Sequence, residues 1–209
     1  MATHPAAHSA ATDAIRVDPR QLRTRHALAE ALVRLLERTP LDQITVAELC
    51  REAGVHRTTF YGHFDGVAEF ALAEFSQGID RIAAVEVDPA GESSPDVARR
   101  YLASMRAILA HIAEERAGYR TLFGPATRGV FRIALEDQQR RRARLALEVW
   151  RAQGVPGAPA TDAAIEQAAA FIAGGLVGVI EAWALGDDDD TADASARVLD
   201  LMPAWWPRG

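Results

Sequence analysis

The stretch that decides the fold is ITVAELCREAGVHRTTFYGHF, residues 44–64. Thr45 and Glu48 stand three residues apart, the spacing at which a hydroxyl and a carboxylate satisfy each other's exposed amides at a helix start. Gly54 can supply the left-handed backbone that a tight helix exit needs. A second short helix, over about residues 57–64, follows at once. Two short helices joined at a glycine predict a helix-turn-helix.

The rest of the chain also reads as helix. Ala, Leu, Arg and Glu dominate, and no stretch shows sustained apolar alternation. A longer helix, Pro19 to Arg38, precedes the motif. Further helices are expected over about 66–87, 94–115, 118–123, a long segment ending near 153, 162–185 and 191–205. The predicted fold class is all-α, with about nine helices: a three-helix helix-turn-helix domain followed by a larger helical domain.

Charge is distributed unevenly along the 209 residues, whose net charge is −6. Residues 16–64 hold eight Arg against six acids, and residues 65–209 hold 15 Arg against 22 acids. A mildly basic front on an acidic body fits a front that meets a polyanion. Cys50 is the only cysteine, so no intrachain disulfide can form. The longest apolar run, residues 168–180, is shorter than a bilayer span and the N-terminus lacks a signal-peptide core, so we expect a cytoplasmic protein without a membrane partner.

The helix-turn-helix divides its side chains between core and surface. The residues expected to point inward are Val46, Leu49, Ala53, Val55, Phe60 and Phe64. Those left to face outward are Arg57, Thr58, Thr59, Tyr61, Gly62 and His63. Arg and Thr suit base edges or phosphates, Tyr and His suit phosphates, and glycine leaves room for close approach. The competing interpretation is that Tyr61 and His63 merely cover the core.

Residues 20 to 80 resemble the DNA-binding domain of TetR-family transcriptional regulators. The resemblance is carried by Leu28, Leu32, Ile44-Thr45-Val46, Leu49, Ala53-Gly54-Val55, Arg57, Thr59-Phe60-Tyr61 and His63-Phe64. It implies that Thr45, Tyr61 and His63 contact phosphates, while Arg57, Thr58 and Thr59 approach bases.

The sequence departs from the family pattern at three positions. The family often has a basic residue at Ala47, Ser at His56 and Lys at Val67. Losing that Lys predicts weaker nonspecific affinity, or compensation by Arg20, Arg23 and Arg25. Asp65 and Glu69 also place two acids beside the expected DNA face.

The body resembles one TetR branch more loosely, a branch that includes regulators of dihydroxyacetone kinase operons. The matching segments are Tyr119-Arg120-x-Leu122-Phe123-Gly124-Pro125 and Phe171-Ile172-Ala173-Gly174-Gly175-Leu176-x-Gly178, with Trp183 beyond. The resemblance implies a homodimer formed by the last two long helices. The apolar run 168–180 and its glycines independently favour a partner helix, although a central helix of a monomer would look similar. The predicted interface residues are Phe171, Gly174, Gly175, Gly178 and Trp183.

An effector pocket would use large apolar side chains midway along the body. The candidates are Phe70, Phe75, Tyr101, Met105, Ile108, Tyr119, Phe123, Phe131 and Phe171. Aromatic residues at helical spacing more often form ordinary core, so this prediction competes with a strong alternative. The Asp187–Asp190 run is expected to be a helix-capping turn, and the six histidines lack metal-ligand spacing. No pattern predicts a metal site, a cofactor or a catalytic centre, so we do not expect an enzyme.

These observations predict three parts: a disordered tail over 1–19, a DNA-binding domain over 20–66 that extends to about 80 with the next helix, and a regulatory and dimerisation domain over 67–209. The predicted function is a homodimeric repressor that binds a palindromic double-stranded operator and is released by an apolar or aromatic small molecule. The alternative is a helical ligand-binding or protein-interaction module without sequence-specific DNA binding.

Overall fold

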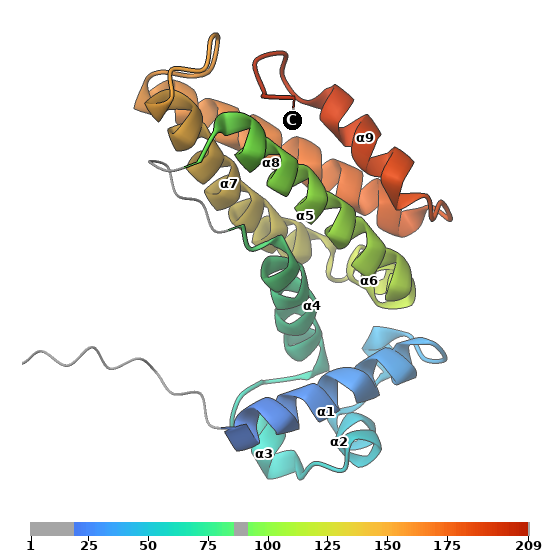
Figure 1. The fold of residues 1–209 in the computed structure, drawn as a ribbon. Coiled ribbons are helices and arrows are strands. Elements are labelled where there is room, and N and C mark those ends of the chain that lie inside the picture. The colour runs from blue at the N-terminus through green and yellow to red at the C-terminus, as the bar shows by residue number, and fades with distance from the viewer. Residues whose placement is uncertain (1–18, 86–91, 209) are drawn as a thin grey trace, which may run out of the picture.

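A computed structural model describes residues 19–85 and 92–208; the predicted tail falls outside this range except for its last residue. Within it the chain forms nine α-helices and a 3-10 helix, with no strand, so the all-α prediction is confirmed for the described residues. The helices are α1 (Pro19–Leu36), α2 (Val46–Ala53), α3 (Arg57–Tyr61), α4 (Val67–Ala83), α5 (Ser94–Glu114), α6 (Arg116–Leu122), α7 (Arg128–Ala152), α8 (Asp162–Leu185) and α9 (Thr191–Leu201), with the 3-10 helix η1 at Leu41–Gln43. Figure 1 shows α1, α2 and α3 gathered at one end, α4 leading away from them, and α5, α7, α8 and α9 forming the body.

The start and end of α2 follow the predicted chemistry. The Thr45 backbone N–H donates to Glu48 Oε2 at 3.0 Å, and the Glu48 N–H donates to Thr45 Oγ1 at 3.2 Å, which completes the capping box. Gly54 takes φ +65°, and its N–H donates to Arg51 O at 3.3 Å. The capping box and the glycine exit are therefore confirmed, because both depend only on local backbone geometry.

Several helix ends differ from the sequence prediction by a few residues. The helix α3 ends at Tyr61 rather than near residue 64, and α9 ends at Leu201, two residues before Pro203. A proline ring disfavours helical backbone in the residue before it, which explains the early end of α9. The cap of α5 is Ser93, whose hydroxyl accepts from Asp96 N at 3.3 Å.

One apolar core runs from the helix-turn-helix into the body. Leu32, Leu49 and Phe60 in the front are fully buried, and they belong to the same cluster as Phe70 of α4 and Ile108 of α5. The boundary expected near residue 66 thus lies within continuous apolar packing. A second cluster fills the far end of the body around α7, α8 and the C-terminal segment.

The aromatic side chains of this second cluster close the far end of the body. Trp150 of α7 is fully buried and lies edge-on to Trp206, with 5.3 Å between ring centroids. Trp206 is in turn edge-on to Tyr101 of α5 at 6.0 Å. The segment after α9 is therefore held against both α5 and α7.

The helix α8 is long and apolar enough, by length and composition alone, to cross a membrane, with a mean hydropathy of 1.8 over its best window. Core helices of soluble proteins pass the same test, and two features of α8 fit that explanation. One side of the helix is buried against the subunit, and its Glu181 carboxylate is bound by Arg128 and Arg132 of α7.

Two arginines of α6 hold the C-terminal end of α8. Arg116 Nη1 donates to Trp183 O at 2.8 Å, and its guanidinium lies 5.5 Å from the centroid of the Trp183 ring. Arg120 Nη2 donates to Gly186 O at 2.7 Å. The last turn of α8 carries no basic residue of its own, so these contacts satisfy its free carbonyls.

The Asp187–Asp190 run starts α9. Asp190 Oδ1 accepts from Ala192 N at 3.1 Å and from Asp193 N at 3.0 Å. Asp188 Oδ2 accepts from Arg197 at 2.9 Å. The prediction of a helix-capping turn is confirmed.

Candidate nucleic-acid interface

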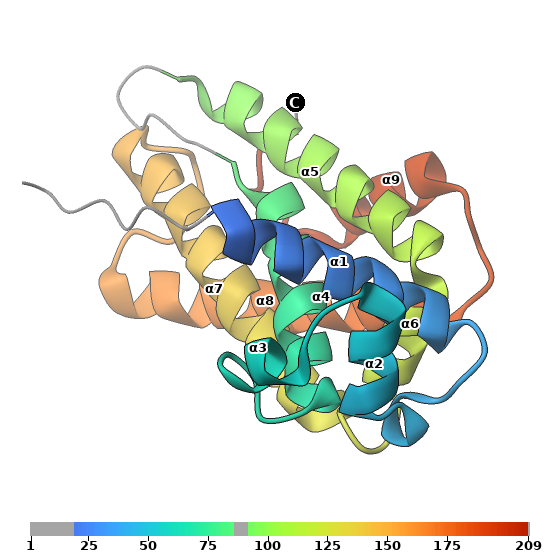
Figure 2. The ribbon, with the colours of Figure 1, turned by 90° about the horizontal axis from the view of Figure 1, so that it is seen from below.

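The outward face of α3 carries polar side chains that the rest of the molecule leaves exposed. The exposed residues are Arg57, Thr58, Thr59, Tyr61, Gly62 and His63, while Phe60 between them is fully buried. Tyr61 is 58 % exposed. Within the described residues no carboxylate forms an ion pair with Arg57, so its guanidinium is available to an external anion. Figure 2, seen from below, shows α3 and α2 at the surface of the front.

An aromatic cluster fixes the orientation of this short helix. Phe60 lies 5.7 Å from Phe64 and 5.9 Å from Phe70 between ring centroids, and Phe64 lies 4.9 Å from Phe70. Phe60 is also edge-on to Tyr61 at 5.8 Å. A five-residue helix has little stability of its own, so this packing against the start of α4 is what holds it in place.

The start of α1 shares a groove with α3. The groove has a volume of about 430 Å³, and its lining includes Arg20 on one side and Thr59 and His63 on the other. Arg20 and Arg23 are both exposed. The structure therefore brings the first turns of α1 beside the expected DNA face, as the compensation hypothesis requires.

Arg25, the third arginine near the start of α1, is held by an acid of α4. Its Nε donates to Glu74 Oε2 of α4 at 2.6 Å, and its guanidinium lies 6.0 Å from the centroid of the Phe64 ring. Arg81 also reaches Glu74, at 3.4 Å. Arg25 thus connects α1 to Phe64, which follows α3, and to Glu74 of α4. Its pairing with Glu74 competes with any contact between Arg25 and a DNA phosphate.

Packing explains one departure from the family pattern, Val67, and capping hydrogen bonds engage polar groups near the expected DNA face. Val67 is 7 % exposed and belongs to the core, so this residue has become part of the interior. Glu69 Oε2 accepts from the Asp65 N–H at 2.6 Å, which ties this acid to the start of α4. Thr45 is exposed, but its hydroxyl is already bonded to Glu48 at 2.8 Å.

The comparisons agree with this geometry. Residues 28–73 match the family model described as bacterial regulatory proteins, tetR family. The front of this chain is a TetR-family domain. No curated protein matches the chain.

Solved structures share the TetR fold over most of the chain. A putative TetR-family transcriptional regulator from Rhodococcus sp. has TM-score 0.64 and 18 % identity, covering 89 % of this chain and 100 % of that one. The dihydroxyacetone kinase operon activator DhaS has TM-score 0.63 and 16 % identity, with coverage of 86 % and 93 %. The fatty acid degradation regulator FadR from Bacillus halodurans has TM-score 0.60 and 14 % identity, with coverage of 86 % and 94 %. The chain therefore shares the fold of these regulators over 86 to 89 % of its length.

The predicted body residues of this TetR-type fold fall into three environments. Tyr101 and Met105 line a cavity between α5, α7, α8 and α9. The other aromatic and aliphatic candidates are at most 4 % exposed and belong to the core: Phe70, Phe75, Ile108, Tyr119, Phe123 and Phe131. Phe171 is 72 % exposed on α8, away from the interior, because its side chain lies on the outer face of that helix.

The predicted interface residues also separate. Gly174 is half-buried and Gly175 and Gly178 are exposed on α8, and an added Cβ at any of the three would meet nothing within 4 Å. Trp183, in contrast, is 7 % exposed and its Nε1 donates to Leu109 O at 2.8 Å. It faces the subunit interior because the α8 surface it occupies packs on α5 and α6.

Two residues that line the cavity were not singled out from the sequence. Arg142 belongs to a run of arginines that had the pattern of a solvated face, and Gln139 carried no signal. Both are on α7, and Gln139 is only 2 % exposed. The spacing of buried and exposed positions along α7 could have indicated that Gln139 and Arg142 lie on its inner side. The many charged residues of this helix obscure that spacing.

Proposed function

We propose that this protein is a homodimeric transcriptional repressor that binds a palindromic operator and is released by a small molecule. The observation that carries the proposal is the exposed side of α3 and of the two residues after it. Six of the seven positions 57–63, all but Phe60, are exposed and suited to DNA. Arg57, Thr58 and Thr59 would approach bases, and Thr45, Tyr61 and His63 would contact phosphates.

Binding to phosphates would extend onto α1. Arg20 lines the same groove as Thr59 and His63, and Arg23 is exposed on the same helix, so both are suited to the backbone flanking the major groove. Arg25 is a weaker candidate because Glu74 already neutralises it. This arrangement supports compensation by Arg20 and Arg23 for the lysine that Val67 replaces.

A dimer would cover the exposed apolar surface of α7 and α8. Phe171 and Leu185 of α8 are 72 % and 52 % exposed, and Val130 and Ile133 of α7 are each 61 % exposed. Gly175 and Gly178 would let a partner helix approach closely. Large exposed apolar patches mark association sites, and two recognition helices about 34 Å apart read a palindrome.

The helix α4 would carry the signal between the body and the front. Its first turns pack Phe70 against Phe60 and Phe64, and its Glu74 binds Arg25 of α1. Its far end contacts the body, where Ser104 Oγ of α5 donates to Ala83 O at 3.4 Å. A ligand that favours one position of α4 would shift the population toward a spacing unsuited to DNA, and DNA would weaken ligand binding by the same factor.

The test begins with bound fragments selected from the source genome, which identify the operator. We expect Arg57→Ala to weaken binding to that site by roughly tenfold or more while circular dichroism stays unchanged. Arg140→Ala, at an exposed arginine on α7 remote from the front, is the matched control and should bind as the wild type does. Full sequence preference in Arg57→Ala would contradict the assignment.

The rival is a helical module that does not bind specific DNA. The acids Asp65 and Glu69 beside the front favour it slightly. The two are separated by the salt dependence of binding to the selected duplex and to heparin, which should be steep for the regulator and shallow for the rival. DhaS, whose fold is similar, is described as an activator, so reporter expression with and without the gene should decide the direction of regulation.

A further inference from the structure

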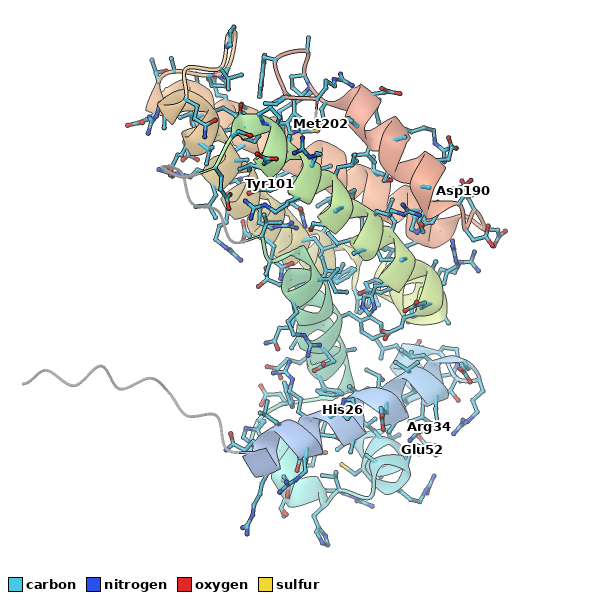
Figure 3. All side chains as sticks on the ribbon, viewed as in Figure 1. His26, Arg34, Glu52, Tyr101, Asp190 and Met202 are labelled. Atoms are coloured by element: carbon cyan, nitrogen blue, oxygen red, sulfur yellow. The ribbon has the colours of Figure 1, made fainter. Side chains whose placement is uncertain are left out.

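The cavity in the body carries a specific polar chemistry on one wall. It has a volume of about 50 Å³, several times the roughly 10–15 Å³ that a single water needs. Its walls are mostly apolar and include Met105, Ile172, Leu176 and Met202. Tyr101 and Met202, labelled in Figure 3, lie on α5 and just after α9. Arg142 is the one charged residue among the lining residues that the structure describes.

Two hydrogen-bond donors in this wall are buried and have no partner among the residues that the structure describes. They are Nε of Arg142 and Nε2 of Gln139. Arg142 Nη1 donates to Gln139 Oε1 at 3.4 Å, which orients the amide so that its nitrogen is the free group. Gln139 is 98 % buried, since its exposed fraction is 2 %. A buried donor without an acceptor is costly, so the wall is complementary to a group that brings acceptor oxygens.

Arg142 also lacks an ion-pair partner among the described residues. Its contacts are neutral: Nη2 donates to Ser104 Oγ at 2.8 Å, and the guanidinium lies 5.8 Å from the centroid of the Tyr101 ring. Within the described residues no carboxylate forms an ion pair with it, and Asp80 acts on it only from a longer distance. Burial lowers the pKa of the guanidinium, yet an arginine stays protonated at neutral pH. The site therefore favours an anion.

We propose that this cavity binds a small organic acid, with its carboxylate on Arg142 and Gln139 and its apolar body among the methionine and aliphatic side chains. This inference rests on the proposed function, since it names the chemical class of the effector. A carboxylate matches a guanidinium in plane and charge, and one negative charge balances one arginine. A phosphate dianion would leave net negative charge in an apolar cavity. Met105 and Met202 can adapt to acids larger than the resting cavity.

The same arginine connects the cavity to α4. Arg142 donates to Ser104 Oγ, and Ser104 donates to Ala83 O in the last turn of α4. A carboxylate that draws the guanidinium toward itself weakens this chain of hydrogen bonds. Ligand charge thereby changes the support for the far end of the helix that reaches the DNA-binding front.

The binding experiment uses the full chain with sodium benzoate and sodium hexanoate as probes, and benzamide and hexanamide as their neutral counterparts, at constant ionic strength. We expect at least one acid to raise the melting temperature and to bind in calorimetric titration. The corresponding amide should bind more weakly by roughly tenfold or more. Equal binding of acid and amide, or no binding of either acid, would overturn the proposal.

Three variants test the residues. Arg142→Met should lose acid binding by roughly tenfold or more, while the control Arg140→Met should keep it. Gln139→Glu places a carboxylate beside Arg142, so it should raise the melting temperature of the free protein and abolish acid binding. This variant keeps the test decisive if Arg142→Met does not fold. Acid binding retained in Gln139→Glu would contradict the assigned site.

A DNA-binding measurement separates this inference from the proposed function. The acid that binds should change the affinity for the selected operator, and Ser104→Ala should keep acid binding but reduce that change. Operator binding without acid binding would refute the ligand assignment alone. Acid binding without any specific DNA binding would leave the cavity assignment standing and refute the regulator.

Discussion

The front and the body of this molecule use arginine in opposite ways. Arg57 of α3 is exposed and forms no ion pair within the described part of the chain, and its charge costs little free energy because water solvates it. Arg142 of α7 is half-buried overall, with an Nε that has neither water access nor a partner. The first arrangement suits a large external polyanion, whereas the second suits a small acid that enters the subunit. The environment, and not the residue type, decides which anion each arginine favours.

The two regions also differ in what holds them together. In the front, two short helices are oriented by contacts local in sequence and by a few aromatic rings that pack on α1 and α4. In the body, arginines bind groups far along the chain, as Arg116 and Arg120 do at the end of α8 and Arg128 and Arg132 do at Glu181. The predictions below test how separate these regions are, beginning with the largest expected effect.

The first prediction concerns Phe60, which is fully buried beneath the recognition face. Phe60→Ala should lower the free energy of unfolding by about 3–5 kcal/mol, because a large cavity opens in a packed core. Since one apolar cluster joins the front to α4 and α5, urea denaturation should still show a single transition. Phe131→Ala, at an equally buried body position in the same cluster, should lower that same transition. Two separate transitions would show that the front folds independently.

The second prediction concerns Glu181, the acid that joins α7 to α8. Burial opposes ionisation of this carboxyl, but hydrogen bonds from Arg128 and Arg132 outweigh it and lower its pKa below the ordinary 4.5. A lowered pKa stabilises the fold above pH 4.5, and that contribution is lost as the pH falls through the folded-state value. Glu181→Gln should lower the free energy of unfolding at pH 7 by about 1–2 kcal/mol, discounted because both arginines reach solvent.

The pH dependence provides the check on that assignment. The difference between wild type and Glu181→Gln should shrink as the pH drops below 4.5, since the wild-type carboxyl then loses its charge. Glu136→Gln removes a partner of Arg132 that is more exposed than Glu181, and it should change stability much less. A difference that stays constant down to strongly acidic pH would mean that charge is not the source of the effect.

The third and smallest prediction compares two glycines whose backbone φ angles are almost the same. Gly54 after α2 has φ +65° and Gly154 after α7 has φ +63°, and an added Cβ would meet nothing within 4 Å at either site. Each change to Ala should therefore lower the free energy of unfolding by roughly 1 kcal/mol, from backbone strain alone. Only Gly54→Ala should also weaken operator binding, because Gly54 sets the angle between α2 and α3. Equal DNA binding by both variants would contradict that role.

The sequence alone determined the helix-turn-helix, because its signals are local. Thr45 and Glu48 cap each other within one turn, Gly54 needs no distant partner to take its backbone angle, and the apolar spacing that buries Phe60 leaves Arg57 outside. The Asp190 cap was predictable for the same reason.

Only the tertiary structure decided the roles of the body residues. The sequence suggested a phosphate contact for Arg25 and a dimer interface for Trp183, and it gave Arg142 no role. Their actual hydrogen-bond partners lie 38 or more positions away along the chain. Arg142 stands in a run of charges, and only the crossing of α5, α8 and α9 over α7 places it in an apolar cavity. Burial and pairing depend on which helices meet, and that information is spread over the whole sequence rather than held in a motif.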